Sequence, residues 1–551
     1  MNRRQFMLAP LSPRNHSTTA AEFSQPHADP RFASTPSLER YDGPWDKTTV
    51  LHLLRRTLLG PGVRDVQEAM AMSMDALVAK LTAPVAELPP PPPRIGAWMD
   101  NPTTFFNSDR LDLTLALDNE MRRWWCGLMV EDGLSVRERM TLFWHNHFPI
   151  DASVCFDPRY VYLQNQLFRR HALGNFKQLV RDITVDKGML YYLDGKLNKK
   201  GTELNENYAR ELQELFTIGV ADNNGTPNYT QQDVHEVARV LTGWGFWGAG
   251  ITGDVGCPPW FGHDPTDKVV YGKVIKGREY GEEELDDLLD IIFDREETPR
   301  YIVRKLYRFF VYTDTRLTPF SPIAQNIEDA IIAPLAHEFR SSNWDIGHVL
   351  RILFSSRHFY DAYVIGACIK SPIDHLVGTV RTFHTGSATG KPSEFLLESL
   401  HVNANELGQW LLVPPGVQGW SFYRSWISGT TLPMRHTFTD RLIDGGETFY
   451  YDIIGSLDAY PEKIFGVLRV NTLAFARQFD SFANDPEQLI REVAEHFLAY
   501  PPTPRLLGQL REALLQGQPE YEWPAQSEAF REARLRGMLK FLMRSANYQL
   551  M

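Results

Sequence analysis

The sequence predicts a mainly α-helical protein, a large multi-helix, bundle-like assembly in two packed lobes with one small β-hairpin. Apolar residues recur at three- and four-residue intervals through most of the chain, which is the spacing of helices with one buried face. The 551 residues exceed the roughly 250 to 300 at which a single hydrophobic core stops growing. Hydrophobic residues make up 43% of the chain, which is enough for a sizeable core.

The first 42 residues are expected to form a flexible leader. Arg3 and Arg4 give the start of the chain the look of a twin-arginine export signal. The apolar stretch 6–11 is shorter than the roughly 7 to 15 residues of a signal's apolar core, so we interpret the signal as degenerate. A cytoplasmic location and export in folded form both stay open. Residues 12–42 are rich in Ser, Thr, Pro, Ala and His and show no periodicity.

Because of the length of the chain, two lobes are expected after the leader, residues 43–318 and 319–551. A stiff polyproline segment interrupts the first helices at 89–93, and the helical pattern is strong from Leu111 onward. The junction of the lobes is expected near 315–322. Short β-branched runs around a glycine at 268–275 predict the hairpin. Further helices are expected at 322–340, 344–355, 370–384, 394–412, 485–499 and 525–545.

Charge and cysteine content exclude several classes of protein. The formal net charge of −11 opposes attraction to a phosphate backbone, so we expect no nucleic-acid partner. No run of about 18 apolar residues occurs, which argues against a membrane-spanning helix. The four cysteines are far apart and form no Cys-x-x-Cys pair, which argues against a zinc ribbon or a disulfide framework.

The segment 205–219 carries the densest group of functional side chains. A helix over 206–218 would bury one apolar stripe, end at Gly219, and carry Glu211 and Glu214 beside that stripe. Two partly solvated carboxylates three residues apart can bind a divalent cation or share a proton. The alternative is that Glu206 pairs with Arg210, and Arg210 with Glu214, in ordinary i, i+4 ion pairs on the helix surface.

The next helix begins with a capping box, in which Asp233 reaches back to Thr230. About ten residues separate the two helices, which predicts an antiparallel pair. That pairing would place four charged groups in one polar seam, namely Glu211, Glu214, Glu236 and Arg239.

His145 and His147 allow two geometries. If the helix persists to Pro149, His147 shares a face with Met140, Phe143 and Trp144, and His145 lies on a different side. If the helix ends near Trp144, as Pro149 favours, both imidazoles point the same way, a His-x-His spacing suited to a metal. A single buried, neutral, hydrogen-bonded histidine is the simpler alternative.

His263 and Asp264 lie on a turn before the hairpin, among aromatic residues. An imidazole and a carboxylate on a loop are typical of a functional site. The structural alternative is an Asx turn at Asp264 with Lys268 as a surface partner.

These blocks, in this order, resemble the bacterial family called domain of unknown function 1800 (DUF1800). The resemblance covers roughly residues 45–440 and is most specific over 205–244. It implies a mainly helical protein, often encoded beside a second uncharacterised family similar to the alkaline phosphatase superfamily, and no established reaction. Gln213 and Ile218 depart from the family's usual leucine without disturbing the charged set. The family's motif residues carry over as His145, Asn146, His147, Asn205, Tyr208, Arg210, Glu211, Glu214, Asp233, Glu236, Arg239, His263 and Asp264.

Two functions fit this pattern best; a redox protein, suggested by the tryptophans and tyrosines of the same blocks, is a weaker third, because no dinucleotide fingerprint or haem-attachment motif is present. The first is a metal-assisted hydrolase, in which a divalent cation activates water and an arginine steadies an anionic substrate or transition state. The second is a noncatalytic partner or scaffold for the phosphatase-like neighbour or for a surface polymer. The candidate catalytic residues are Glu211, Glu214, Arg210, Arg239 and Asn205, and the candidate metal ligands are His145, His147, His263 and Asp264.

Overall fold

The computed structural model describes residues 35–84, 86–99, 111–155, 157–247, 254–312, 323–383, 392–421, 423–445, 448–452 and 463–551. Residues 36–551 form one compact unit. The junction expected at 315–322 lies outside the described residues, as do residues 1–34 of the expected leader. The division into two lobes therefore stays a prediction.

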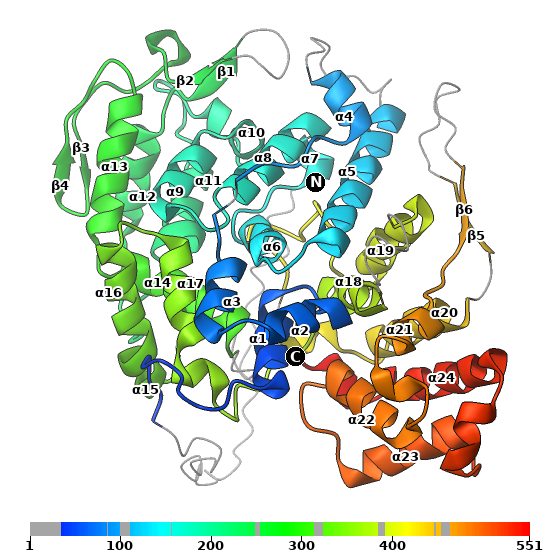
Figure 1. Cartoon of the computed structure of the whole chain (residues 1–551). Helices are drawn as coiled ribbons and strands as arrows, with labels where there is room; N and C mark the ends of the chain where they lie inside the picture. Colours follow the sequence, from blue (N-terminus) through cyan, green and yellow to red (C-terminus); the bar gives the residue numbers. More distant parts are fainter. Residues whose placement is uncertain are drawn as a thin grey trace, which may run out of the picture. The chain divides into compact units, whose positions relative to one another are not determined.

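The prediction of a mainly α protein is confirmed, and helices predominate throughout the described chain (Figure 1). The helices before residue 312 are α1 Lys47–Thr57, α2 Val63–Met70, α3 Met74–Leu81, α4 Pro93–Trp98, α5 Leu111–Glu131, α6 Arg137–His147, α7 Ala152–Cys155, α8 Pro158–Arg170, α9 Phe176–Thr184, α10 Lys187–Tyr192, α11 Asn207–Glu211, α12 Gln231–Val240, α13 Glu282–Asp294 and α14 Glu297–Phe310. Those after residue 323 are α15 Gln325–Ile327, α16 Ala333–Ser341, α17 Ile346–Ser355, α18 Pro372–Phe383, α19 Glu394–Glu406, α20 Thr431–Asp444, α21 Thr472–Ala476, α22 Pro486–Phe497, α23 Pro504–Leu515 and α24 Glu528–Met543.

Two short π-helical segments and several 3-10 turns interrupt these helices. The π-helical segments are η5 Leu212–Thr217 and η7 Glu328–Ile332. The 3-10 turns are η4 Gly195–Leu197, η6 Pro259–Phe261, η8 Arg357–Tyr360, η10 Tyr423–Trp426, η11 Asp480–Phe482, η12 Glu520–Ala525 and η13 Ala546–Gln549.

The strands of the described residues form three antiparallel two-stranded sheets. The predicted hairpin is confirmed as β3 Lys268–Val270 and β4 Lys273–Ile275, with Val270 opposite Lys273. Tyr271 and Gly272 have φ of 48° and 74°, as a two-residue hairpin turn requires. The other two hairpins were not predicted: β1 Gly245–Trp247 with β2 Asp254–Gly256, and β5 Thr448–Asp452 with β6 Lys463–Val467.

Most expected helices after residue 322 are present, but the helix expected over 394–412 is shorter. It is α19, which ends at Glu406, and Gly408 then adopts a φ of 88° that a helix cannot continue. Helices α20 and α23 were not predicted. None of the helices in the described part of the chain is both long and apolar enough to cross a bilayer.

The segments that carry the candidate residues pack on one another within this unit. Helix α6 lies against α8, and α11 lies against α12, which confirms the predicted pairing of those two helices. Strand β3 packs on α12, and β4 packs on α13 (Figure 1). Helix α14 contacts η5, and both segments contribute buried residues to the hydrophobic core.

Candidate functional site

The predicted helix over 206–218 is confirmed, with a change of geometry that the sequence did not reveal. It consists of α11 and η5, so the bonding pattern changes at Leu212 to the wider π-helical turn. Gly219 follows with a φ of 77° and serves as the expected cap. The apolar stripe is buried as predicted, and single π-helical turns inside helices occur frequently at functional sites.

Glu211 and Glu214 lie at this change of geometry and differ in their partners. Glu214 Oε2 accepts a hydrogen bond from the Tyr229 hydroxyl at 2.8 Å. Within the described part of the chain, the partly buried Glu211 carboxylate has no hydrogen bond or ion pair. Burial, and then repulsion from Glu214, raises the pKa of Glu211 to about 7. An unpaired carboxylate of this kind can hold or release a proton near neutral pH.

The carbonyl groups at the end of η5 are bound by side chains from other helices. Tyr301 Oη donates to the Leu215 carbonyl at 2.9 Å, and Lys305 Nζ donates to the same oxygen at 3.0 Å. His147 Nε2 donates to the Phe216 carbonyl at 3.0 Å. These contacts satisfy carbonyl groups that a helix leaves unpaired at its end, which is a structural role.

His147 and Lys305 also contact each other. Lys305 Nζ donates to His147 Nδ1 at 2.9 Å, which accounts for the second ring nitrogen of His147. Burial, followed by the positive charge of Lys305, holds the pKa of His147 well below its usual value. Burial, followed by repulsion from Arg308, lowers the pKa of Lys305 to about 7. His147 is therefore the buried, neutral, hydrogen-bonded histidine that the sequence allowed.

The extended alternative for His145 and His147 is wrong. Helix α6 runs through His147, so the two imidazoles lie on different sides of it. His145 is buried among aromatic rings, with centroid distances of 5.3 Å to Trp420 and 5.5 Å to Trp125. Burial lowers the pKa of His145 to about 3, and its Nε2 has no partner among the described residues.

Arg210 and Asn205 make local contacts beside Glu211. Arg210 Nη2 lies 3.2 Å from Glu206 Oε2, which confirms one of the two i, i+4 pairs expected on this helix. The same nitrogen donates to the Gln231 side chain at 2.9 Å, whereas Glu214 binds Tyr229 instead. Asn205 Oδ1 accepts from the backbone N–H of Asn207 and so shapes the turn before α11.

Helix α12 begins with the predicted capping box and carries Arg239 on its flank. Arg239 Nη1 pairs with Glu236 at 2.7 Å, and its Nε pairs with Asp264 at 2.9 Å. Its remaining nitrogen, Nη2, donates to the side chain of Thr266 and to the backbone carbonyl of Asp267. Each of the three guanidinium nitrogens of Arg239 therefore donates to a protein oxygen.

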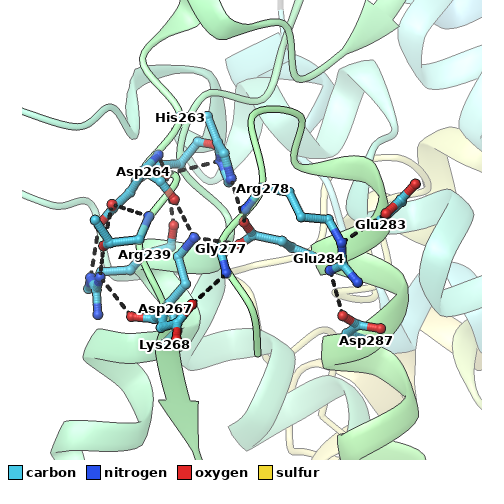
Figure 2. Close-up of polar contacts among 12 residues, drawn as sticks. Arg239, His263, Asp264, Asp267, Lys268, Gly277, Arg278, Glu283, Glu284 and Asp287 are labelled. Carbon is cyan, nitrogen blue, oxygen red and sulfur yellow. Dashed lines mark hydrogen bonds and ion pairs between the residues drawn. The ribbon is translucent and has the colours of Figure 1, made fainter. Parts of the chain in front are cut away.

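A buried network, which we call the Glu284 network, joins His263, Lys268 and Glu284 (Figure 2). Lys268 Nζ lies 2.5 Å from Glu284 Oε2, and His263 Nε2 lies 3.2 Å from Glu284 Oε1. All three side chains are at most 1% exposed. Burial favours the neutral form of Glu284, but hydrogen bonds from His263 and Lys268 outweigh it and lower its pKa.

Asp264 lies at the edge of this network and adopts the Asx turn that the sequence allowed. Its Oδ1 accepts from the backbone N–H and the hydroxyl of Thr266. Burial acts to raise the pKa of Asp264, but hydrogen bonds from Thr266 and Arg239 lower it to about 2. The expectation that Lys268 is a surface partner is wrong, because its side chain is fully buried against Glu284 and the Asp264 carbonyl.

The structure distributes the expected metal ligands over different surroundings. His145 packs among aromatic rings, His147 binds Lys305 and a carbonyl, and His263 and Asp264 belong to the Glu284 network and its edge. Over the described ranges, no three His, Cys, Asp or Glu side chains are grouped so that they could hold a metal ion. Glu211, at the end of α11, and Glu214, in η5, form a separate acidic pair.

Comparison with known proteins supports the family resemblance. The profile of the family described as "Protein of unknown function (DUF1800)" matches residues 52–550. The chain belongs to this family. No curated protein and no solved structure matches the chain.

The DUF1800 match extends beyond the region of resemblance near 45–440 and includes the last helices. In this DUF1800 chain, sequence reasoning did not identify Tyr229 and Tyr301 as partners of the η5 segment, or Glu284 as the partner of Lys268. The only local signal for Tyr229 was its position one residue before Thr230, the N-cap of α12. Glu284 lies in a run of acidic residues that is indistinguishable, by sequence, from a solvated first turn of a helix.

Proposed function

We propose that this DUF1800 protein is a hydrolase in which Glu211 is the general base. The observation that supports the proposal is the Glu211 carboxylate, which is partly buried, adjacent to Glu214 and unpaired among the described residues. Elsewhere in the candidate set, charged groups have protein partners, as Arg239 and Asp264 do. A pKa near the working pH suits a group that takes up and then returns a proton.

In this mechanism, Glu211 accepts a proton from water, and the resulting hydroxide attacks the electrophilic atom of the substrate. The protonated carboxyl group then returns its proton to the leaving group. Glu214, held by Tyr229, keeps the pKa of Glu211 high through its negative charge. Arg210, whose side chain is 38% exposed, approaches an anionic group of the substrate.

A divalent cation is the cofactor that we propose for this pair. Carboxylate oxygens are the ligands that Mg²⁺ and Mn²⁺ prefer, and Mg²⁺ commonly keeps several waters beside one or two carboxylates. Glu214 would hold such an ion and leave Glu211 free as the base, and the ion would polarise a water when bound. Histidine ligation receives less support, because both ring nitrogens of His147 already have partners.

The test is turnover of a panel of ester, phosphoester, glycoside and peptide substrates, with and without Mg²⁺ or Mn²⁺. Glu211→Gln is expected to lower kcat by about 100- to 10,000-fold, the usual contribution of a general base. Without an added cation, the activity of the unmodified protein should rise with pH through about 7, because the base must be ionised.

Glu203→Gln is the matched control, because Glu203 is exposed, four residues before α11, and its carboxylate has no partner among the described residues. This variant should keep full activity and the same pH profile. Turnover that is unchanged in Glu211→Gln would contradict the proposal, as would a folded protein that cleaves none of the four bond classes.

A noncatalytic role as partner or scaffold is the second candidate. It is favoured by the complete internal pairing of Arg239, His147 and the Glu284 network, which is typical of structural polar groups. The partner would be the phosphatase-like neighbour or a surface polymer. Copurification with that neighbour, unchanged in Glu211→Gln, would favour this role over catalysis.

A further inference from the structure

A small cavity lies between α6, α14, the residues at the start of α18 and the loop that follows α19. Its volume is about 50 Å³. One water needs roughly 10 to 15 Å³ of such a volume. The cavity therefore has room for about four waters, or for the head group and first carbons of a small organic molecule. Its apolar walls come from Leu142, Phe309, Ile369, Trp420 and Trp426.

Neighbouring backbone N–H groups fix which way two amide side chains of the lining are turned. Asn146 Oδ1 accepts from the backbone N–H of Trp420 at 2.6 Å, and Gln409 Oε1 accepts from that of Ile373 at 3.0 Å. A backbone N–H can only donate, so in each amide the oxygen must face the backbone and the NH₂ group must point elsewhere. Neither NH₂ group has a partner among the described residues, although Gln409 is only 5% exposed.

A guanidinium group adds further donors to the lining. Arg139, 2% exposed, donates from Nη1 to Asp374 Oδ1 at 2.5 Å and to the Leu58 carbonyl at 3.2 Å. Its Nη2 has only a weak sulfur acceptor, Met551 Sδ, at 3.7 Å, and its Nε has no partner among the described residues. Buried donors without acceptors are costly, so this arrangement favours a ligand that brings acceptors.

Asp374, an acidic residue of the lining, does not accept from the unpaired donors of Asn146 and Gln409. Asp374 Oδ1 is bound to Arg139, and its Oδ2 accepts from the backbone N–H of Ser371 at 3.0 Å. The unpaired polar groups of Asn146, Gln409 and Arg139 are therefore all donors. A cationic ligand would find no unpaired acceptor among them.

We propose that this cavity binds the carboxylate of a small organic acid, with the short apolar part of the acid against Phe309, Trp420 and Trp426. A planar carboxylate has two acceptor oxygens, which suit the two amide NH₂ groups and the guanidinium. The site is separate from Glu211 and does not depend on the proposed hydrolysis.

The experiment measures binding of propionate to the full chain by calorimetry at constant ionic strength, with propylamine and inorganic phosphate as alternative probes. Propionate should bind, and propylamine should not. Gln409→Glu and Asn146→Asp keep the oxygen that accepts from the backbone but replace the NH₂ donor with a negatively charged oxygen. Each is expected to weaken propionate binding by about tenfold or more, through a lost donor and repulsion.

Asn484→Asp is the matched control, because it makes the same chemical change at an exposed position and should bind propionate normally. Glu211→Gln should also bind it normally, which separates this proposal from the proposed function. If one cavity variant fails to fold, the other still decides the outcome. The proposal is overturned if propionate does not bind, if both folded cavity variants bind it as tightly as the unmodified protein, or if propylamine or phosphate binds more tightly.

Discussion

The Glu284 network and the Glu211 and Glu214 pair use the same kinds of side chain in opposite ways. Glu284 is fully buried and contacts two basic groups, Lys268 and His263 (Figure 2). Glu211 is only partly buried, and a second carboxylate is its charged neighbour on the same helix. The pKa of Glu284 is consequently lowered, whereas that of Glu211 is raised to about 7.

The difference shows that pairing, more than burial, decides the direction in which the pKa of each carboxylate moves. The oxygens of the buried Glu284 carboxylate are bound by Lys268, His263 and the backbone N–H of Arg278, and so are not available to a substrate. A partly solvated carboxylate beside a like charge keeps both its oxygens and its proton available. Four substitutions test this contrast, from the largest expected effect to the smallest.

Glu284→Gln should destabilise the protein by about 3 to 5 kcal/mol, because it leaves the charge of Lys268 buried without its counterion. Urea denaturation measures the change in the free energy of unfolding. Glu283→Gln is the control, since the Glu283 side chain is 76% exposed and its ion pair with Arg278 should contribute about 0 to 1 kcal/mol. Equal losses in the two variants would remove the contrast between paired burial and exposure.

Glu211→Gln should stabilise the protein above pH 7, by about 1 kcal/mol after allowance for partial solvation. The folded-state pKa of Glu211 is raised, so its contribution to stability is present below its ordinary pKa of 4.5 and is lost as the pH rises through about 7. Gln carries no charge at either pH. Unfolding curves at pH 4 and pH 8 measure the effect, and a gain that is the same at both would contradict it.

Glu214→Gln should move the titration of Glu211 to lower pH by several tenths of a pH unit, because it removes the neighbouring negative charge. The amide oxygen of Gln can still accept from Tyr229, so the local structure should persist. NMR of isotope-labelled glutamate side chains measures the midpoint. A midpoint that stays near 7 would assign the raised pKa of Glu211 to burial alone.

Arg210→Ala should cost only about 0.3 to 0.5 kcal/mol, the usual contribution of an exposed i, i+4 pair such as Arg210 with Glu206. Thermal unfolding at low and moderate salt measures it, and the difference should shrink as salt is added. A cost of several kcal/mol would place Arg210 with the buried network instead of the accessible pair.

Local sequence signals predicted the elements that carry the site. Thr230 with Asp233 correctly marked the start of α12, and Gly219 correctly marked the end of the preceding helix. The position of Glu211 beside Glu214 followed from their spacing. Their partners did not follow, because the π-helical turn at Leu212 changes which side chains are neighbours, and Glu214 binds Tyr229 where Arg210 was expected.

Long-range contacts explain the remaining differences. Asn146 binds the backbone of Trp420, 274 residues away in the chain. Gly419 fits there because a Cβ at that position would lie 2.3 Å from Asn146 Oδ1. Neither the Asn146 motif nor the Gly419 loop contains a sign of the other.

The sequence by itself determined the helical class, the main helices with their caps, and the family, because periodicity, capping and motif order are local properties of the chain. Only the tertiary structure decided which charged groups are paired and which amide donors line a cavity. The physical reason is that pairing and desolvation depend on groups brought together from distant parts of the chain, and a side chain's chemistry follows from those neighbours.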